Sequence, residues 1–266
     1  YIIYFNVLEV MKYIKTEIDF KTAILTVDRE KKLNALNSDV IVELNEIIDN
    51  YIADSSISSI IITGAGNKSF IAGADIAQML EFSSLEASNY SKNGILLFNK
   101  IEKSPKPIIA AINGYALGGG CELALACHIR YSSEESLFGL PEVTLGLIPG
   151  FGGTQRLKRI VGPGLANELI FSGKYVDSKE ALRIGLVNKM CDDVIEESMK
   201  LCNIISKNSP LAISHAIKSM ACGEDVSYFD SFDIENNFFS QLFNSYDSKE
   251  GMQAFVEKRK PLFKGK

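Results

Sequence analysis

The sequence has no tryptophan and only two histidines, His128 and His215, which lie far apart in the chain. A serine–histidine–aspartate arrangement or a metal site built from several histidines is therefore not expected. The cysteines form no C-x-x-C pair, and an odd, scattered set of this kind predicts reduced thiols in a cytoplasmic protein. We expect the histidines and cysteines to be structural. The cysteines are Cys121, Cys127, Cys191, Cys202 and Cys222.

Basic residues are also fewer than acidic ones, with 28 Lys and Arg against 33 Asp and Glu, which gives a net charge of −5. We therefore expect neither a nucleic-acid nor a membrane partner. Residues 1–10 are apolar but much shorter than the roughly 20 residues of a membrane-spanning helix. They also lack the basic region and cleavage site of a signal peptide. Because Met11 looks like a natural start, we expect residues 1–10 to be a non-native or upstream extension.

Strand and helix patterns alternate up to about residue 150. The predicted strands are 13–19 and 22–28, which form a hairpin, and the apolar runs 59–63 and 107–112. Ser38 and Asp75 are the predicted caps of two helices, and Gln78 completes a variant capping box with Asp75. Two further helices are predicted over 84–102 and 120–128. This alternation predicts an α/β fold with parallel strands and right-handed crossovers.

Helical patterns dominate the remainder of the chain, with one short strand near 186–189. They cover 153–161, 163–172, 178–184, 193–207, 210–221, 228–245 and 248–257. We therefore expect a core over residues 11–205 and a helical region over residues 206–266.

Two short glycine-rich turns each follow a predicted strand and precede a helix. In the first, residues 64–75, free N–H groups favour a negative or carbonyl oxygen, and a tight turn of small residues is the alternative. Its Gly-Ala-Gly lacks the third glycine of a dinucleotide motif. In the second, residues 118–120, glycine permits a positive φ or a close approach to a ligand, and a structural turn is the alternative. If Ala74 and Gly119 direct their N–H groups to one point, they form an oxyanion hole.

Two glutamates accompany these turns. Glu122 lies in the first turn of an apolar helix, where burial raises the pKa of a carboxylate and requires a reason. A helix N-terminal charge with a path to solvent is the alternative. Glu142 follows Pro141 and by itself is better interpreted as structural. Together, two carboxylates beside backbone N–H groups favour general acid and base chemistry.

The C-terminal residues 257–266 carry a basic run in an acidic chain. Such a run is usually a solvated terminus, and a nucleotide phosphate is the alternative partner. Lys31 and Lys32 form a second basic pair before a predicted helix.

At these motifs the chain resembles the crotonase, or enoyl-CoA hydratase, family. The resemblance is carried by Leu33-Asn34-Ala35-Leu36, by residues 70–76, by Gly118-Gly119-Gly120-Cys121-Glu122, by Phe138-Gly139-Leu140-Pro141-Glu142, by residues 147–157 and by residues 251–260. It extends over residues 11–266 nearly without gaps.

The resemblance implies a spiral of repeated ββα units with a C-terminal helical trimerisation domain, assembled as a trimer or dimer of trimers. It implies a hydratase acting on a short-chain 2-enoyl-CoA, with no cofactor because coenzyme A is part of the substrate. Ala74 and Gly119 would bind the thioester oxygen. Glu122 would activate the water that attacks C3, and Glu142 would deliver a proton to C2.

The resemblance also implies a set of substrate-binding residues along the acyl-CoA. Lys258 would contribute to it from a neighbouring subunit, at the CoA phosphates. The set is Lys32, Leu33, Ala72, Gly73, Asp75, Ile76, Gly118, Pro141, Leu145 and Lys258.

Three positions depart from the family pattern. Leu140 replaces a polar residue, His128 replaces an Asp, and Glu30 replaces a Pro. A double-bond isomerase of the same superfamily and a non-catalytic acyl-CoA or RNA-binding scaffold are the alternative functions. Neither glutamate is replaced, which favours the hydratase.

Overall fold

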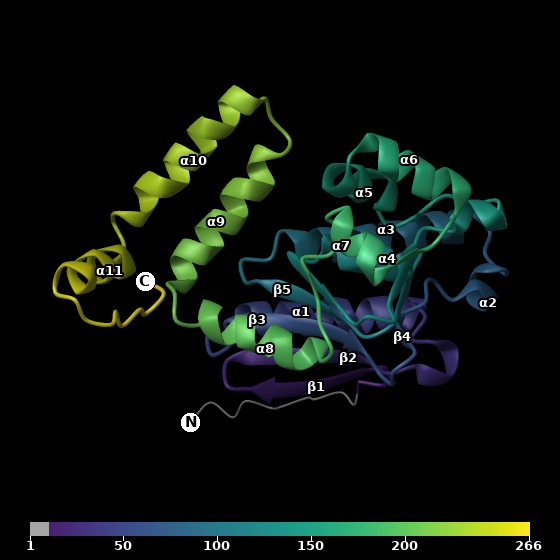
Figure 1. Cartoon of the computed structure of the whole chain (residues 1–266), viewed down its shortest axis with the longest axis horizontal. Helices are drawn as coiled ribbons and strands as arrows, with labels where there is room; N and C mark the ends of the chain where they lie inside the picture. The colour runs from purple at the N-terminus through teal and green to yellow at the C-terminus, as the bar shows by residue number, and fades with distance from the viewer. Residues whose placement is uncertain (1–10) are drawn as a thin grey trace.

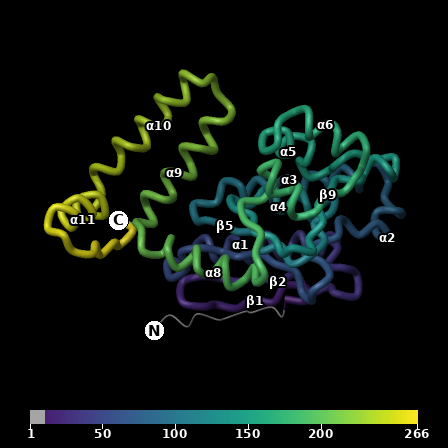
Figure 2. The backbone as a smooth tube through the Cα atoms, in the orientation of Figure 1, coloured from purple at the N-terminus to yellow at the C-terminus, as the bar shows by residue number. Residues whose placement is uncertain are grey.

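The computed structural model of the chain describes residues 11–266, so the expectation for residues 1–10 lies outside the described part. Figure 1 shows an α/β body with three C-terminal helices beside it. The trace in Figure 2 shows the same separation, with the C-terminus returning to the start of α9. Along residues 11–266, no helix combines the length and the apolar character that crossing a bilayer requires.

A six-stranded sheet forms the floor of the body, in the order β1-β2-β3-β5-β7-β10. Its strands are β1 (Ile14–Asp19), β2 (Thr22–Val27), β3 (Ser59–Gly64), β5 (Ile108–Ile112), β7 (Ile129–Ser132) and β10 (Lys189–Met190). The first two form the expected antiparallel hairpin, and each remaining neighbour pairs in parallel. The predicted parallel α/β arrangement is confirmed.

A second, four-stranded sheet was not predicted from the sequence. Its strands are β4 (Ser69–Ile71), β6 (Tyr115–Leu117), β8 (Leu137–Gly139) and β9 (Val176–Asp177), in that order. The pairs β3–β4, β5–β6 and β7–β8 each place one strand in the large sheet and the next in the small one. Each pair is followed by a helix. The expected ββα repeat is therefore present.

The helices of the body follow the predicted pattern closely. They are α1 (Ser38–Ala53), α2 (Ile76–Met79), α3 (Ser84–Glu102), α4 (Gly119–Ala126), α5 (Gly153–Val161), α6 (Pro163–Ser172), α7 (Ser178–Arg183) and α8 (Val194–Ile205). Two short 3₁₀ segments, η1 (Glu30–Lys32) and η2 (Glu142–Leu145), precede α1 and α5. The helices α1 and α3 bury apolar stripes against the large sheet, where a buried aliphatic side chain stabilises by roughly 1.5–3 kcal/mol.

Two predicted helix starts were wrong in detail. The cap of α1 is Asn37 rather than Ser38, because the Asn37 side chain accepts the Val40 N–H at 2.9 Å. Asp75 precedes α2 but makes no capping hydrogen bond, since its carboxylate binds Arg29 instead. The Gln78 side chain accepts the N–H of Ser38, so the capping box does not form.

The C-terminal region consists of α9 (Pro210–Gly223), α10 (Tyr228–Leu242) and α11 (Tyr246–Val256), which lie to one side of the body (Figure 1). No side chain of α10 is buried, and Phe229 and Phe255 are 80% and 86% exposed. The basic tail is ordered, because buried Asp247 accepts the N–H groups of Lys264 and Gly265. The division of the chain at residue 205 stays a prediction.

Candidate active site

A cavity of about 260 Å³ lies where the two glycine-rich turns and both glutamates meet. Ten of the sequence-predicted site residues line it: Ala72, Gly73, Ala74, Ile76, Gly118, Gly119, Glu122, Pro141, Glu142 and Leu145. The turns come together because β4 and β6 are parallel neighbours in the small sheet, so the segments that follow them lie side by side. Residues roughly 50 positions apart thereby share one wall.

Glu122 is the buried carboxylate of this cavity, with 1% of its surface exposed. Its Oε1 accepts the N–H groups of Phe151 and Gly153 at 2.8 and 2.7 Å. Burial raises the pKa of Glu122 to about 7 and nearby Glu142 contributes to the rise, while the two N–H donors oppose it. Within residues 11–266 its Oε2 has no hydrogen-bond partner, so one oxygen is anchored and the other remains for a ligand or water.

Glu142 begins η2 and is held differently. Its Oε2 is buried and has no hydrogen-bond partner within the described residues. Burial raises the pKa of Glu142, and no positively charged side chain contributes to the shift. An unpartnered buried carboxyl oxygen is stabilised when it carries a proton. The two glutamates therefore differ in chemistry: Glu122 has donors for its charged form, and Glu142 lacks them outside its own backbone.

The predicted oxyanion donors line the same cavity. Leu36 forms a parallel bridge with Ala74. The Leu36 N–H donates to the Gly73 carbonyl, and the Leu36 carbonyl accepts the Asp75 N–H. The Ala74 N–H is left without an acceptor within residues 11–266. Gly119 begins α4, so its N–H has no partner in its helix. Gly118 has φ +49°, a conformation that favours glycine and turns the chain into α4.

The apolar walls of the cavity were missed by the sequence reasoning. They come mainly from α3 and from the segment before α5: Met79, Ala87, Tyr90, Ser91, Leu147, Ile148, Gly150 and Phe151. Tyr90 donates to the Leu36 carbonyl at 2.8 Å and packs edge-on against Phe151. Tyr90 could have been predicted from the sequence, because it is the one tyrosine of the helix 84–102 and lies on the apolar face of that helix.

Four predicted residues do not line the cavity: Lys32, Leu33, Asp75 and Lys258. Leu33 and Asp75 instead support the turn that does. The Leu33 carbonyl accepts the Ala72 N–H at 3.0 Å, and Asp75 forms an ion pair with Arg29 at 2.9 Å. Lys258 follows α11, outside this cavity of its own chain.

Leu140 and His128, two of the departures from the family pattern, make structural contacts. Leu140 is buried in the core, next to the point at which the Glu122 side chain contacts Gly153. The His128 Nδ1 accepts the Ile108 N–H at 2.9 Å. All five cysteines are free thiols. Among residues 11–266, no three His, Cys, Asp or Glu side chains are grouped so that they could hold a metal ion.

Comparison with known proteins adds evidence from the whole chain. The sequence profile of the family described as "Enoyl-CoA hydratase/isomerase" matches residues 17–266. The chain is 44% identical over 242 residues to the short-chain-enoyl-CoA hydratase of Clostridium acetobutylicum, covering 90% of this chain and 93% of the relative. It is 43% identical over 245 residues to the crotonyl-CoA hydratase of Syntrophomonas wolfei, covering 91% and 94%.

Solved structures give the same result. The crystal structure of an enoyl-CoA hydratase from Bacillus anthracis superposes with a TM-score of 0.92 at 34% sequence identity. The superposition covers 96% of this chain and all of that structure. The two sheets and the C-terminal helices described above are thus shared with it.

Proposed function

The chain belongs to the enoyl-CoA hydratase/isomerase family and has the crotonase fold, and on that premise we propose that it is an enoyl-CoA hydratase. The reaction is the reversible addition of water across the 2,3 double bond of a short-chain 2-enoyl-CoA, which gives a 3-hydroxyacyl-CoA. The observation that carries the proposal is the pair of differently held glutamates in one cavity with two free backbone N–H groups.

The roles of the glutamates follow from their hydrogen bonds. Glu122, whose charged form accepts two backbone N–H groups, holds the water with its free Oε2 and takes its proton as the hydroxyl bonds to C3. Glu142, whose Oε2 has no partner, carries the proton that bonds to C2. One water is consumed, and solvent exchange returns the proton from Glu122 to Glu142.

The free N–H groups of Ala74 and Gly119 stabilise the charge that develops on the thioester oxygen when C3 is attacked. Removing one such donor typically costs on the order of 100- to 1,000-fold in rate. The remaining cavity wall is apolar, and Tyr90 and Phe151 close it beside the glutamates.

Substitution of each glutamate by glutamine tests the proposal directly. Glu122→Gln and Glu142→Gln should each lose most hydration of crotonyl-CoA, measured by the disappearance of the conjugated enoyl-thioester absorbance. A positioned acid or base contributes roughly 100- to 10,000-fold. Near-normal turnover in both variants would refute it. Incubation with a 3-enoyl-CoA detects isomerisation by the appearance of the conjugated product.

We also propose that the chain acts as a trimer or dimer of trimers in which Lys258 of a neighbouring subunit binds the CoA phosphates. The support is the unburied face of α10 and the position of Lys258 outside its own cavity. Lys258→Ala should raise KM for crotonyl-CoA and leave KM for crotonyl-pantetheine, which lacks those phosphates, unchanged. Equal effects on both substrates would exclude this role.

The compartment that we propose is the cytoplasm. The supporting observation is that all five thiols are free, two of them at or near the surface (Cys191 and Cys222). Fractionation of the native cells, with the chain detected by antibody, tests this location.

A further inference from the structure

The loop that precedes α5 holds the proposed base, Glu122, by two backbone N–H groups. The Glu122 Oε1 accepts the N–H of Phe151 at 2.8 Å and the N–H of Gly153 at 2.7 Å. These two N–H groups belong to two different peptides, Gly150–Phe151 and Gly152–Gly153. What fixes each of these peptides therefore decides how firmly the carboxylate is held.

The peptide that carries the Gly153 N–H is fixed by the backbone of α5. Its carbonyl, that of Gly152, accepts the N–H groups of Gln155 and Arg156 at 3.0 and 2.9 Å. The Phe151 carbonyl, which lies between the two donating peptides, accepts Nη1 of the buried Arg156 at 2.9 Å. This half of the loop is thus held by residues of α5.

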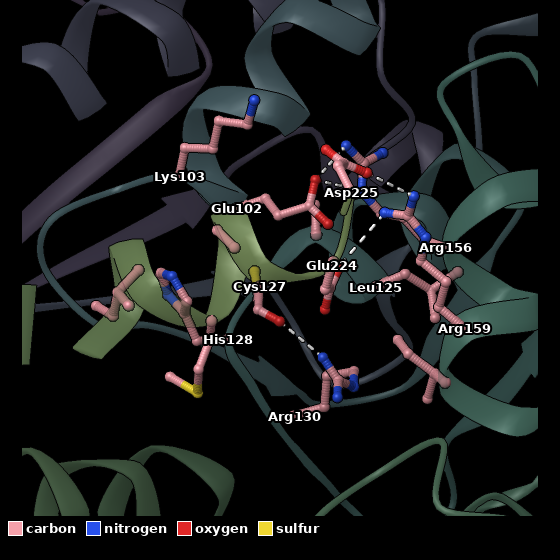
Figure 3. Close-up of a pocket in the computed structure, with 15 residues that line it drawn as sticks. Glu102, Lys103, Leu125, Cys127, His128, Arg130, Arg156, Arg159, Glu224 and Asp225 are labelled. Atoms are coloured by element: carbon pink, nitrogen blue, oxygen red, sulfur yellow. Dashed lines mark hydrogen bonds and ion pairs between the residues drawn. The ribbon is translucent and has the colours of Figure 1, made fainter. Parts of the chain in front are cut away.

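Arg156 is in turn fixed by the last turn of α3. Its guanidinium pairs with Glu102 at 2.9 Å and donates to the Asn99 Oδ1 at 2.6 Å. Arg156 and Glu102 also line a second cavity, of about 270 Å³, which is lined by His128 and bounded by α9 (Figure 3). The contacts of Arg156 therefore join the loop to the end of α3.

The Gly150–Phe151 peptide lacks support of this kind. Its carbonyl accepts the Ser91 hydroxyl at 2.6 Å, and no other group within residues 11–266 donates to it. Because Gly150 has no Cβ, the peptide that follows it can rotate more freely than a peptide after a larger residue. In the described chain, Ser91 and Glu122 are therefore the two groups that fix the orientation of this peptide by hydrogen bonds.

Ser91 lies in α3 and lines the cavity that contains the two glutamates. A serine inside a helix often bonds to a carbonyl of its own preceding turn. Ser91 instead donates to residue 150, which is 59 positions away in the chain. Because the carbonyl that it binds and the Phe151 N–H belong to one peptide, this bond also strengthens the one to Glu122.

We propose that Ser91 is a positioning residue for Glu122: its hydroxyl orients the peptide whose N–H stabilises the charged form of that carboxylate. This role rests on the proposed function, because Ser91 acts through the base of that reaction. The hydroxyl of Ser91 is directed to the loop, so it does not take part in the proton transfers itself.

The other charged and titratable groups around Glu122 come from four elements. Burial raises the pKa of Glu122 to about 7, and Glu142 from η2 adds to the rise, whereas Arg156 from α5 opposes it. Burial, and to a smaller extent nearby carboxylates that include Glu122, raise the pKa values of Tyr90 from α3 and Cys121 from α4. Tyr90 and Cys121 therefore stay neutral near pH 7, where Glu122 titrates.

The test compares Ser91→Ala with the wild-type chain in crotonyl-CoA hydration across pH. Without the hydroxyl, the Phe151 N–H is a weaker donor to the charged carboxylate, so the pKa of Glu122 should rise further. The acidic limb of kcat/KM should move up by about 0.5 to 1 pH unit, which lowers kcat/KM at pH 6 about three- to tenfold, the range that one hydrogen bond contributes. The loss should shrink above pH 8, and the alkaline limb should stay in place.

Two further variants on α3 separate this role from a structural one. Ser91→Thr keeps the hydroxyl and should keep the wild-type pH profile. Ser88→Ala removes a hydroxyl that makes no hydrogen bond within the described residues, from a position that is half-buried like Ser91, and should also keep the wild-type profile. Circular dichroism establishes that each variant is folded.

An infrared titration separates failure of this inference from failure of the proposed function. The protonated-carboxyl band that is missing from Glu122→Gln reports the ionisation of Glu122 without any turnover, and Ser91→Ala should raise its midpoint by about 0.5 to 1 pH unit. The inference is overturned if folded Ser91→Ala titrates like the wild type, or if Ser88→Ala or Ser91→Thr shifts as much as Ser91→Ala. Absence of hydration by the wild type would instead refute the proposed function, and the infrared comparison would still decide whether Ser91 positions the carboxylate.

Discussion

Gly153→Ala should reduce the turnover of crotonyl-CoA without unfolding the chain. Gly153 is the first residue of α5, and its N–H donates to the Glu122 Oε1 at 2.7 Å. A methyl group at this position would lie 2.9 Å from the Glu122 Cγ and 3.0 Å from the Leu140 Cδ1. Because ordinary contact begins at 3.4 Å, the Glu122 side chain must move by about 0.5 Å.

A displacement of this size should lower kcat by roughly ten- to a hundredfold, because a misplacement of about 1 Å can cost roughly a hundredfold. KM should stay within about twofold, because the predicted CoA contacts lie elsewhere. Steady-state hydration of crotonyl-CoA measures both constants, and circular dichroism measures Tm. The backbone of Gly153 is compatible with alanine, and overpacking at such a site costs roughly 1–3 kcal/mol, so Tm should fall while the chain stays folded.

Gly164→Ala is the matched control. Gly164 is the second residue of α6, and a methyl group there would have nothing within 4 Å. It should leave kcat unchanged, and Tm should stay the same or rise, because alanine favours helix. An unchanged kcat in folded Gly153→Ala, or an equal loss in both variants, would refute the reasoning.

Three further predictions follow from the same contacts. Because the pKa of Glu122 is about 7, kcat/KM should fall as pH decreases through about 7, and a loss confined to below about pH 5 would contradict this. Because folding raises the pKa of Glu122 from 4.5 to about 7, the wild-type chain loses up to about 3 kcal/mol of stability as the pH rises from 4.5 to 7. The Tm of Glu122→Gln minus the Tm of the wild type should therefore increase from pH 5 to pH 8. Arg29→Gln removes the pair with Asp75 and should reduce kcat about tenfold by loosening the turn at Ala74, whereas Arg29→Lys should restore part of it. Gly120→Ala should give little folded protein, because its methyl group would lie 1.9 Å from the Ile71 carbonyl oxygen.

The long helices and strands could be predicted from the sequence because their patterns are local. α3 and α6 match the predicted ranges at both ends, and the hairpin turns where Phe20 interrupts the alternation. The small sheet could not be predicted because its strands are two or three residues long, too short for a period to show. They form because each ββα repeat places its second strand beside the second strand of the repeat before it, as β6 lies beside β4 and β8 beside β6.

The site shows the same division between local and distant contacts. The motifs predicted the glutamates and both turns that line the first cavity, and the catalytic roles of these residues stay a prediction. The pairing of Asp75 with Arg29 joins residues 46 positions apart, so a local capping pattern at Asp75 was misleading. The cavity that His128 lines is likewise bounded by α9, which comes from the C-terminal region of the chain.

The glycines beside the glutamates are required by packing as well as by turn geometry. A methyl group at Gly118 would lie 2.9 Å from the Glu142 Oε1, and one at Gly153 would lie 2.9 Å from the Glu122 Cγ. Gly120 lets α4, which carries Glu122, lie directly on β4. Each glycine removes the side chain that would otherwise hold a carboxylate or its helix away from the cavity. Close packing buries Glu122 and raises its pKa, while the Phe151 and Gly153 N–H groups that the same packing brings in lower it. The opposition of these two effects places the pKa near 7, where a general base is most effective at neutral pH.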